Sequence, residues 1–308
     1  MSQYHQPVLL AESIEGLGVK PNGVYVDVTF GGGGHSRNIL KQLINGTLLA
    51  FDQDEDARQN ADDLAEEFQE RSFTFIESNF RHLKKYLKFH GLAQVDGVLA
   101  DLGVSSHQFD VGERGFSTRF DGPLDMRMNQ GQGVSARTIV NEYSEKELIH
   151  LLSAFGEVRN ARTLAAEIVL ERSIEQITTS DRLKAVAERV APKGKLMKYL
   201  AQLFQAIRIE VNDEMGALQA FFEQTKEVIK PGGRLVVISY HSLEDRMAKN
   251  YITKGNFKGT VEKDFYGNLL RPFDPVNRKL ITPSEKEIEN NNRARSARLR
   301  IAERTTWR

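Results

Sequence analysis

Residues 24–35, VYVDVTFGGGGH, constrain the fold of this 308-residue chain more than any other stretch. The first seven are almost all apolar, aromatic or β-branched, as in a strand buried between helices. Four glycines follow at 31–34, and an apolar helical pattern then begins at Ile39 and Leu40. A strand that passes through a glycine turn into a helix places backbone N–H groups and the positive helix end against a ligand. Glycine is required because a Cβ would hold the ligand away from the backbone.

The spacing of these glycines narrows the choice of ligand. The dinucleotide fingerprint GxGxxG fails because Ser36 or Arg37 takes its last position, and a phosphate loop fails because no Lys-Ser/Thr pair follows. The remaining pattern, D-x-T-x-G-x-G from Asp27, resembles the first motif of S-adenosylmethionine-dependent methyltransferases. In that motif a carboxylate supports the turn beneath the amino-acid end of the cofactor. The alternative is a flexible glycine loop that joins a strand to a helix.

Composition excludes several classes of protein. Lys and Arg total 42, and so do Asp and Glu, so the overall charge indicates no partner. The chain has no cysteine, which excludes disulfides, thiolate metal sites and cysteine nucleophiles. We read no signal peptide, and no apolar run is long enough to cross a bilayer. We therefore expect a soluble protein of the cytoplasm.

Three more strand-like segments follow the glycine turn, alternating with helical ones. This rhythm predicts a parallel sheet with helices on both faces, and ligands bind such sheets at the carboxyl ends of the strands. We therefore expect one crevice formed by glycines 31–34, Asp52, Phe80 and Asp101.

Asp52 stands 19 residues beyond Gly33, at the end of the second predicted strand. An acidic residue near this spacing suits the two hydroxyls of a ribose. The alternative is an N-cap for a helix that begins near residue 55, a role that Asp54 can also fill.

The alternation breaks after the fourth strand. Residues 107–134 are polar and rich in glycine, which predicts a long ordered loop or lid. Residues 135–209 show helical periodicity only, which predicts an inserted helical domain for substrate recognition. We assign 1–106 and 210–308 to a discontinuous catalytic domain.

The parallel pattern then resumes in the second part of that domain. A helix runs to about residue 229, KPGG at 230–233 stops it, and a fifth strand ends near 239–241. Alternating residues at 297–301 predict a half-exposed terminal strand at the antiparallel edge of the sheet.

Seven unusual strings occur in order along nearly the whole chain. They are FGGGGHS at 30–36, DLGVSSHQFD at 101–110, ERGFS at 113–117, DGPLDMRM at 121–128, QAIRIEVNDE at 205–214, SYHSLEDR at 239–246 and RARSARLRIAER at 293–304. Together they resemble the MraW (RsmH) family, bacterial methyltransferases of small-subunit ribosomal RNA. One departure is His107, which stands where a proline is frequent and affects the geometry of that loop alone.

The resemblance implies a class I S-adenosylmethionine-dependent methyltransferase, α/β and Rossmann-like, with a mostly parallel seven-stranded sheet and an inserted all-helical domain. It implies S-adenosylmethionine as methyl donor and the exocyclic N4 of a cytidine in the decoding region of 16S ribosomal RNA as acceptor. The partner is then ribosomal RNA or the 30S subunit. By the family's pattern, the cofactor contacts are Gly33, Gly34, His35, Asp52, Phe80, Asp101 and Gln108.

Asp101 is the candidate catalytic residue. A cytosine amine is a poor nucleophile because its lone pair is delocalised into the ring, and an acceptor for its N–H groups localises that pair. Amino-methyltransferases present such acceptors after the fourth strand, in an Asp/Asn-Pro-Pro-aromatic turn; here that place holds residues 101–104, without proline or an aromatic ring. The competing role for Asp101 is to bind the cofactor. We expect most of the rate to come from alignment, and no metal, because the histidines lack zinc-binding spacing.

Two basic clusters and His241 are the candidate RNA contacts. The clusters are Lys193, Lys195 and Lys198 on the insertion and Arg293, Arg295, Arg298, Arg300, Arg304 and Arg308 in the tail. Phosphate contacts would make affinity fall steeply with salt; alternatively, Arg298 and Arg300 guard an edge strand and the lysines solvate a loop. His241 either touches the target base or is a satisfied turn histidine. The lid and the insertion are predicted to shape a pocket for a flipped base.

Other classes of function stay open at this point. One is a ribosome-assembly factor that binds the cofactor without turnover, and another is an amino-methyltransferase that acts on DNA, or a methyltransferase that acts on protein. A nicotinamide oxidoreductase is disfavoured by the missing third glycine. Composition and spacing indicate an S-adenosylmethionine enzyme, whereas the assignment of RNA and cytidine as substrate is implied by the resemblance.

Overall fold

The computed structural model describes residues 7–131, 133–277 and 279–306. Within them the chain forms two compact units, which we call the sheet unit, up to Gly103 and from Gly216 onward, and the helical unit, Val104–Met215. The sheet unit thus ends three residues earlier and resumes six residues later than the predicted catalytic domain. The predicted lid, 107–134, falls within the helical unit.

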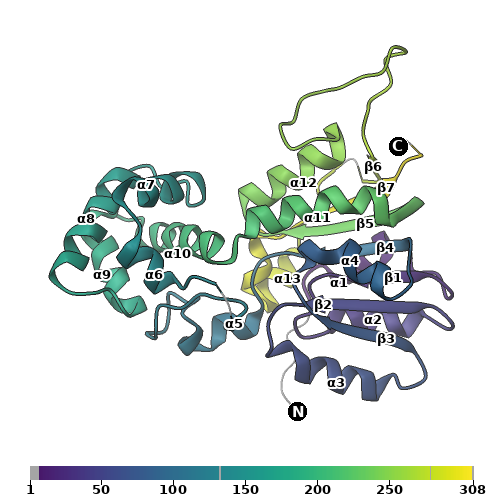
Figure 1. The fold of residues 1–308 in the computed structure, drawn as a ribbon, viewed down its shortest axis with the longest axis horizontal. Coiled ribbons are helices and arrows are strands. Elements are labelled where there is room, and N and C mark those ends of the chain that lie inside the picture. Colours follow the sequence, from purple (N-terminus) through teal and green to yellow (C-terminus); the bar gives the residue numbers. More distant parts are fainter. Residues whose placement is uncertain (1–6, 132, 278, 307–308) are drawn as a thin grey trace. The chain divides into compact units, whose positions relative to one another are not determined.

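The sheet unit contains, in its described part, a seven-stranded sheet in the order β3-β2-β1-β4-β5-β7-β6 (Figure 1). The parallel strands are β1 (Val24–Asp27), β2 (Thr47–Asp52), β3 (Ser72–Glu77), β4 (Val95–Asp101) and β5 (Ile229–Ser239). The antiparallel strands are β7 (Arg298–Arg304), paired to β5, and β6 (Phe273–Pro275), paired to β7. The predicted mostly parallel seven-stranded fold is confirmed.

Helices cover both faces of this sheet (Figure 1). They are α1 (Leu10–Leu17), α2 (Gly34–Gln42), α3 (Ala57–Glu67), α4 (Leu83–Phe89), α11 (Glu214–Val228), α12 (Ser242–Lys254) and α13 (Glu285–Asn290), with 3-10 turns η1 (Phe80–His82) and η3 (Asn292–Ser296). Alternate strand residues face opposite sides. Leu48 and Ala50 of β2 lie in a core with α1, α2 and α3, whereas Phe51 meets Tyr86 of α4 edge to face at 5.8 Å.

Two predictions about the last strands are wrong. The helix ends at Val228, just before KPGG as predicted, but the strand does not begin after KPGG: residues 230–233 lie inside β5, where they form an irregularity between the pairs Val95–Ile229 and Gly97–Arg234. The terminal strand is not the edge either, because the short β6 lies outside β7. Arg298 and Arg300 therefore guard no edge.

The helical unit holds α5 (Ser106–Asp110), η2 (Gly112–Arg114), α6 (Ala136–Glu142), α7 (Glu145–Ala154), α8 (Ala161–Ile174), α9 (Ser180–Val190) and α10 (Leu196–Asn212). The mostly irregular segment 107–134 packs into this unit's core. Phe116, Leu124 and Met126 are buried with residues of the helices, and the buried Arg114 donates hydrogen bonds to two backbone carbonyls of the same segment. Across the described residues, no helix has both the length and the apolar character that spanning a bilayer requires.

Candidate cofactor and methyl-transfer site

Asp27 supports the glycine turn from below, as the motif predicts. Its side chain is fully buried at the end of β1. Ser36 Oγ donates to Oδ2 at 2.7 Å, and the Thr29 N–H donates to Oδ1 at 3.1 Å. These bonds tie the strand end to the first turn of α2. Burial raises the pKa of Asp27 to about 6.

The turn itself requires glycine at Gly33. Its φ is +73°, in the left-handed region, and a Cβ there would lie 2.8 Å from the Phe30 ring. Gly33 is also the N-cap of α2, with no side chain capping the helix. The backbone is therefore shaped for close approach by a ligand at this helix end.

Asp52 closes the other side of the turn from the end of β2. Its Oδ2 accepts the Gly31 N–H at 2.7 Å and its Oδ1 accepts the Asp54 N–H at 2.9 Å. It caps no helix, because α3 begins at Ala57 with Asp56 as its N-cap residue, and Asp54 is not the N-cap either. Burial, reinforced by the charges of Asp54 and Asp27, raises the pKa of Asp52 to about 6.

Asp101 lies at the end of β4, beside β1 in the sheet. Its backbone N–H donates to Thr29 Oγ1 at 2.6 Å, and Tyr240, just after β5, donates its hydroxyl to Asp101 Oδ1 at 2.8 Å. Burial raises the pKa of Asp101 to about 7; the Tyr240 hydrogen bond lowers it, and the charges of Asp27 and Glu244 raise it. The side chain keeps 22% of its surface exposed, so it is accessible to a ligand.

His35 adds no positive charge to this cluster. It is buried at the start of α2, and burial lowers its pKa to about 4, so the ring is neutral near pH 7. Its Nδ1 lies 3.9 Å from Asp101 Oδ2. Its buried Nε2 has no hydrogen-bond partner among the described residues. The neutral His35 ring therefore lies beside Asp101 without forming an ion pair with it.

The electrostatics of the strand ends select the kind of ligand. The pKa values of Asp27, Asp52 and Asp101 are governed by burial, hydrogen bonds and neighbouring carboxylates, and no positive side chain of the described residues contributes to them. Acidic groups held this way are complementary to a cation. S-adenosylmethionine carries a sulfonium, an ammonium group and two ribose hydroxyls, so the residues present fit it.

The other predicted cofactor residues lie in two places. Phe80 opens η1 directly after β3, and its ring packs edge to face on Phe221 at 5.5 Å. Gln108 belongs to the helical unit, where it forms a capping box with Ser105 at the start of α5. Its contact with the cofactor stays a prediction.

Tyr240 and Glu244 are site residues that the sequence reasoning missed. The Glu244 carboxylate accepts the Tyr240 N–H at 2.8 Å, which fixes the backbone that carries the Tyr240 ring. A signal existed: an aromatic residue directly after the fifth strand lies at the same sheet edge as Asp101.

His241 has a structural role. It is the N-cap residue of α12 in a capping box with Glu244, its Nε2 lies 3.0 Å from Glu244 Oε1, and its side chain is 8% exposed. The capping contact fits the turn-histidine alternative, but the buried Nε2 makes no hydrogen bond among the described residues, so a contact with the target base stays a prediction.

The basic clusters differ in how they are paired. Lys193, Lys195 and Lys198 are exposed around the start of α10. Arg293 and Arg295 lie on η3, with Arg295 exposed. Arg298 and Arg300 bind the buried Asp245 of α12 at 3.0 and 2.8 Å, which gives both a structural partner. Arg304 donates to backbone carbonyls, and Arg308 lies outside the described residues.

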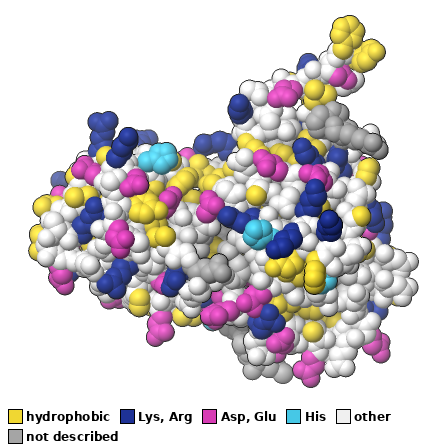
Figure 2. All heavy atoms as spheres, viewed as in Figure 1, with side chains coloured by type: hydrophobic (Ala, Val, Ile, Leu, Met, Phe, Trp, Pro, Cys, Tyr) yellow, Lys and Arg dark blue, Asp and Glu magenta, His cyan; other side chains and the backbone are white. Residues whose placement is uncertain are grey.

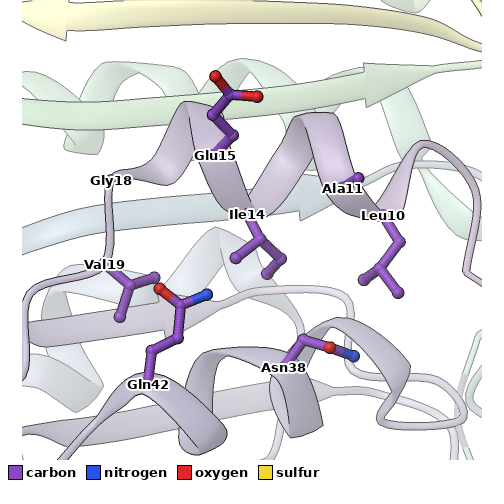
Figure 3. Close-up of a pocket in the computed structure, with 8 residues that line it drawn as sticks. All are labelled: Leu10, Ala11, Ile14, Glu15, Gly18, Val19, Asn38 and Gln42. Carbon is purple, nitrogen blue, oxygen red and sulfur yellow. The ribbon is translucent and has the colours of Figure 1, made fainter.

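A separate groove of about 520 Å³ lies between α1 and α2 (Figure 3). Its lining includes Ile14, Glu15, Asn38 and Gln42 but none of the strand-end carboxylates. We therefore place the candidate site at the strand ends.

Comparison with known proteins extends this assignment. The model of the MraW methylase family matches residues 2–305. The ribosomal RNA small subunit methyltransferase H of Cytophaga hutchinsonii is 57% identical over 98% of this chain and 99% of its own length, and that of Christiangramia forsetii is 56% identical over 98% of each. A solved rRNA methylase from Streptococcus thermophilus aligns over 97% of this chain and 93% of its own, with 12% identity and a TM-score of 0.42.

The family match covers both parts of the sheet unit and the helical unit between them. It confirms S-adenosylmethionine as the cofactor. The chain belongs to the MraW methylase family.

Proposed function

We propose that this methyltransferase methylates the exocyclic N4 of a cytidine in the decoding region of 16S ribosomal RNA. The names of its relatives support ribosomal RNA of the small subunit as substrate. The observation that carries the chemistry is the accessible Asp101 carboxyl group, held by Tyr240 beside a cluster of carboxyls suited to a cationic cofactor. N4 of cytosine is an amino nitrogen whose N–H groups such an acceptor can bind.

The glycine turn and Asp52 are proposed to hold the cofactor. Gly33 and Gly34 let it approach the backbone at the start of α2, and Asp52 is placed to accept hydrogen bonds from ribose hydroxyls. His35 and Phe80 complete the cofactor contacts as apolar or neutral surfaces. S-adenosylmethionine supplies an electrophilic methyl group when bound.

Asp101 is proposed to act on the target amine. As an acceptor, its carboxylate localises the nitrogen lone pair by binding an N–H group. A pKa of about 7 suits both states that this role needs: ionised to accept the hydrogen bond, and basic enough to take the proton that the nitrogen loses. Binding of the cofactor by the same carboxylate is the competing role, and the two are separated by measuring binding and turnover independently.

Tyr240 is proposed as the residue that positions Asp101. Its hydroxyl occupies Oδ1, which orients the carboxylate and favours its ionised form. Alignment of the reacting groups is expected to supply most of the rate.

The proposed RNA contacts are Lys193 and Lys195 of the helical unit and, as a second cluster, Arg293 and Arg295 of the sheet unit. The two lysines and Arg295 are exposed, so they are available to phosphates. His241, whose buried Nε2 makes no hydrogen bond among the described residues, stays a proposed contact with the target base. The segment 107–134 and the helical unit remain the proposed substrate-recognition region, for a base that leaves its stack.

Mass-spectrometric mapping of modified nucleosides tests the function. Ribosomal RNA from cells with and without the gene is digested, and purified protein is then incubated with S-adenosylmethionine and 30S subunits from the deletion strain. We expect N4-methylated cytidine in the decoding region to disappear with the gene and to return with the protein. An assembly factor without turnover would return no methyl group, and a DNA methyltransferase would label DNA instead.

A further inference from the structure

The 256–271 arm leaves the sheet unit between α12 and β6 and carries two exposed aromatic rings at its tip. Phe265 is 97% exposed and Tyr266 is 86% exposed. The arm extends away from the rest of the sheet unit (Figure 1), and hydrophobic side chains lie at its end (Figure 2). Isolated exposed apolar residues are common, but two adjoining rings at the end of a projecting arm indicate an interaction site.

The tip is ordered by its own hydrogen bonds. Asp264 Oδ1 accepts the N–H groups of Tyr266 and Asn268 at 2.9 and 2.8 Å, and Oδ2 accepts Asn268 Nδ2 at 2.9 Å. The turn closes at Gly267, whose φ is +87°. The backbone that bears the rings is thus fixed before binding, which lowers the entropic cost of a contact.

The base of the arm is anchored to the core of the sheet unit. Phe257 stacks on Tyr251 of α12 with ring centres 5.2 Å apart and an interplanar angle of 14°. Asn256 Oδ1 accepts the N–H groups of Gly259 and Thr260 at 2.9 and 3.2 Å. The helix ends at Lys254 with Gly255 in the left-handed conformation, and the base of the arm is held against α12 by these contacts.

The tip has the chemistry of a nucleobase platform. The Phe265 and Tyr266 rings are 5.6 Å apart at 87°, so a flat base that stacks on one ring lies nearly perpendicular to the other. Lys258 and Lys263 are exposed and make no ion pair within the described residues. The Asp264 carboxylate nearby is engaged by the turn. Glu262 is also exposed on the arm, so the two lysines are balanced by two carboxylates, and the two rings are the feature that favours a base.

We propose that this tip binds an unpaired base of RNA by stacking, with Lys258 and Lys263 near the adjoining phosphates. The inference rests on the proposed function, since it adds a second contact with the RNA substrate. Two rings bury roughly 150–250 Å² each, which is well below the roughly 1,000 Å² of a specific protein interface. Stacking needs only one ring face. A base exposes its own flat face for stacking only when it is unpaired.

Fluorescence anisotropy of the full-length protein with a labelled, unstructured 12-nucleotide RNA tests the proposal. Replacing both rings, Phe265→Ala with Tyr266→Ala, is expected to weaken binding about 5- to 150-fold, the range for one lost stack. The loss on a labelled duplex of the same length is expected to be less than about twofold. An equal loss on the duplex would overturn the proposal, because the contact would then be with the backbone.

Two further variants distinguish stacking from apolar docking. Phe265→Leu with Tyr266→Leu keeps apolar surface but no π face, so it is expected to bind the single strand as weakly as the alanine variant. Phe265→Trp with Tyr266→Trp is expected to retain parental affinity. A leucine variant that binds like the parent would overturn the proposal in favour of a protein partner. Phe89→Ala, at an aromatic residue 81% exposed on α4, is the matched control and is expected to change affinity less than about twofold.

Methyl transfer to 30S subunits is measured in parallel. The alanine variant is expected to raise KM and leave kcat unchanged. If the parent binds RNA through the arm but transfers no methyl group, the proposed function is wrong and the proposal about the arm is supported. If the parent methylates 30S subunits and the alanine variant matches it in both affinity and KM, the arm proposal fails and the function stands.

Discussion

Glu171 of the helical unit and the strand-end aspartates of the sheet unit are used in opposite ways. In the helical unit, Glu171 of α8 binds Arg182 and Arg189 of α9, both at 2.9 Å, and these arginines hold its pKa below the usual range. In the sheet unit, Asp52 and Asp101 have raised pKa values and no positive partner that shifts them. The first arrangement joins two helices, whereas the second leaves carboxyl groups at an edge of the sheet.

The difference separates structural charges from ligand-binding ones. A carboxylate beside arginine is satisfied in the folded protein, so it needs no further partner. A buried carboxyl without a cation is unfavourable when ionised, and a cationic ligand removes that penalty. The raised pKa values therefore mark the cofactor site more specifically than the presence of acidic residues does.

The distinction between ligand-binding and structural carboxylates predicts its largest effect at Asp101. Asp101→Asn is expected to lower kcat by about 10²- to 10⁴-fold, because the amide cannot take the proton from the amine. Single-turnover assays give the rate, and titration calorimetry gives the cofactor Kd, which is expected to change far less. Tyr240→Phe serves as the positioning control, with a smaller fall in kcat. Loss of cofactor binding in Asp101→Asn, with turnover controlled elsewhere, would assign Asp101 to the cofactor instead.

A smaller effect is expected at Asp52. Asp52→Asn removes a charge-assisted hydrogen bond to the cofactor, worth about 1.5–3 kcal/mol, so its Kd is expected to rise about 10- to 100-fold. At saturating cofactor, kcat is expected to stay within a few-fold of the parent. Asp54→Asn, two residues away, is the matched control. Equal effects of the two substitutions would mean that Asp52 acts only through the fold of this loop.

Cofactor binding is expected to release protons near pH 6.5. The folded pKa values of about 6 and 7 lie above the ordinary value of 3.8, so the free protein holds these protons, and its stability falls as the pH rises from about 4 to 7. A bound cationic cofactor favours the ionised carboxylates, so its binding releases some of the protons held by Asp52 and Asp101. Calorimetry in buffers of different ionisation enthalpy measures the release, which is expected to vanish near pH 8.5. Release that is unchanged in Asp101→Asn would contradict the assignment.

The smallest effect is expected in the helical unit. Arg189→Ala removes two exposed ion pairs, with Glu167 and Glu171, so Tm is expected to fall by at most a few degrees. Cofactor Kd, measured by calorimetry, is expected to be unchanged. A change in Kd comparable to that of Asp52→Asn would remove the distinction between the two kinds of charge.

Much of the sheet is predictable because parallel strands buried on both faces read as short apolar runs. The runs that end at Asp52 and Asp101 correspond to β2 and β4, and the acids follow at the strand ends. The three-residue β6 is too short to show a pattern, and it moves β7 away from the edge. The irregularity at 230–233 is equally hidden, because KPGG reads as a turn.

The site is less predictable than the strands that carry it. The acidic residues follow from their place in the strands, but the Tyr240–Asp101 hydrogen bond depends on the register of β4 with β5, which aligns Asp101 with Ile238. The burial of part of the segment 107–134 was also not predicted from the sequence. Its apolar residues Leu124 and Met126 have the spacing of a strand, but in the described structure no strand forms there, so their burial against the helices appears only in the packed core.

The separation of β4 and β5 along the chain has a consequence during synthesis. They are neighbours in the sheet, yet more than a hundred residues, the whole helical unit, are translated between them. At about 5–20 residues per second, the side of β4 that pairs with β5 stays unpaired for about 6 to 25 seconds, and an unpaired strand side can associate with other chains. Asp101 meets Tyr240 only at the end of this interval. A nascent chain therefore carries the glycine turn long before it acquires a complete catalytic centre.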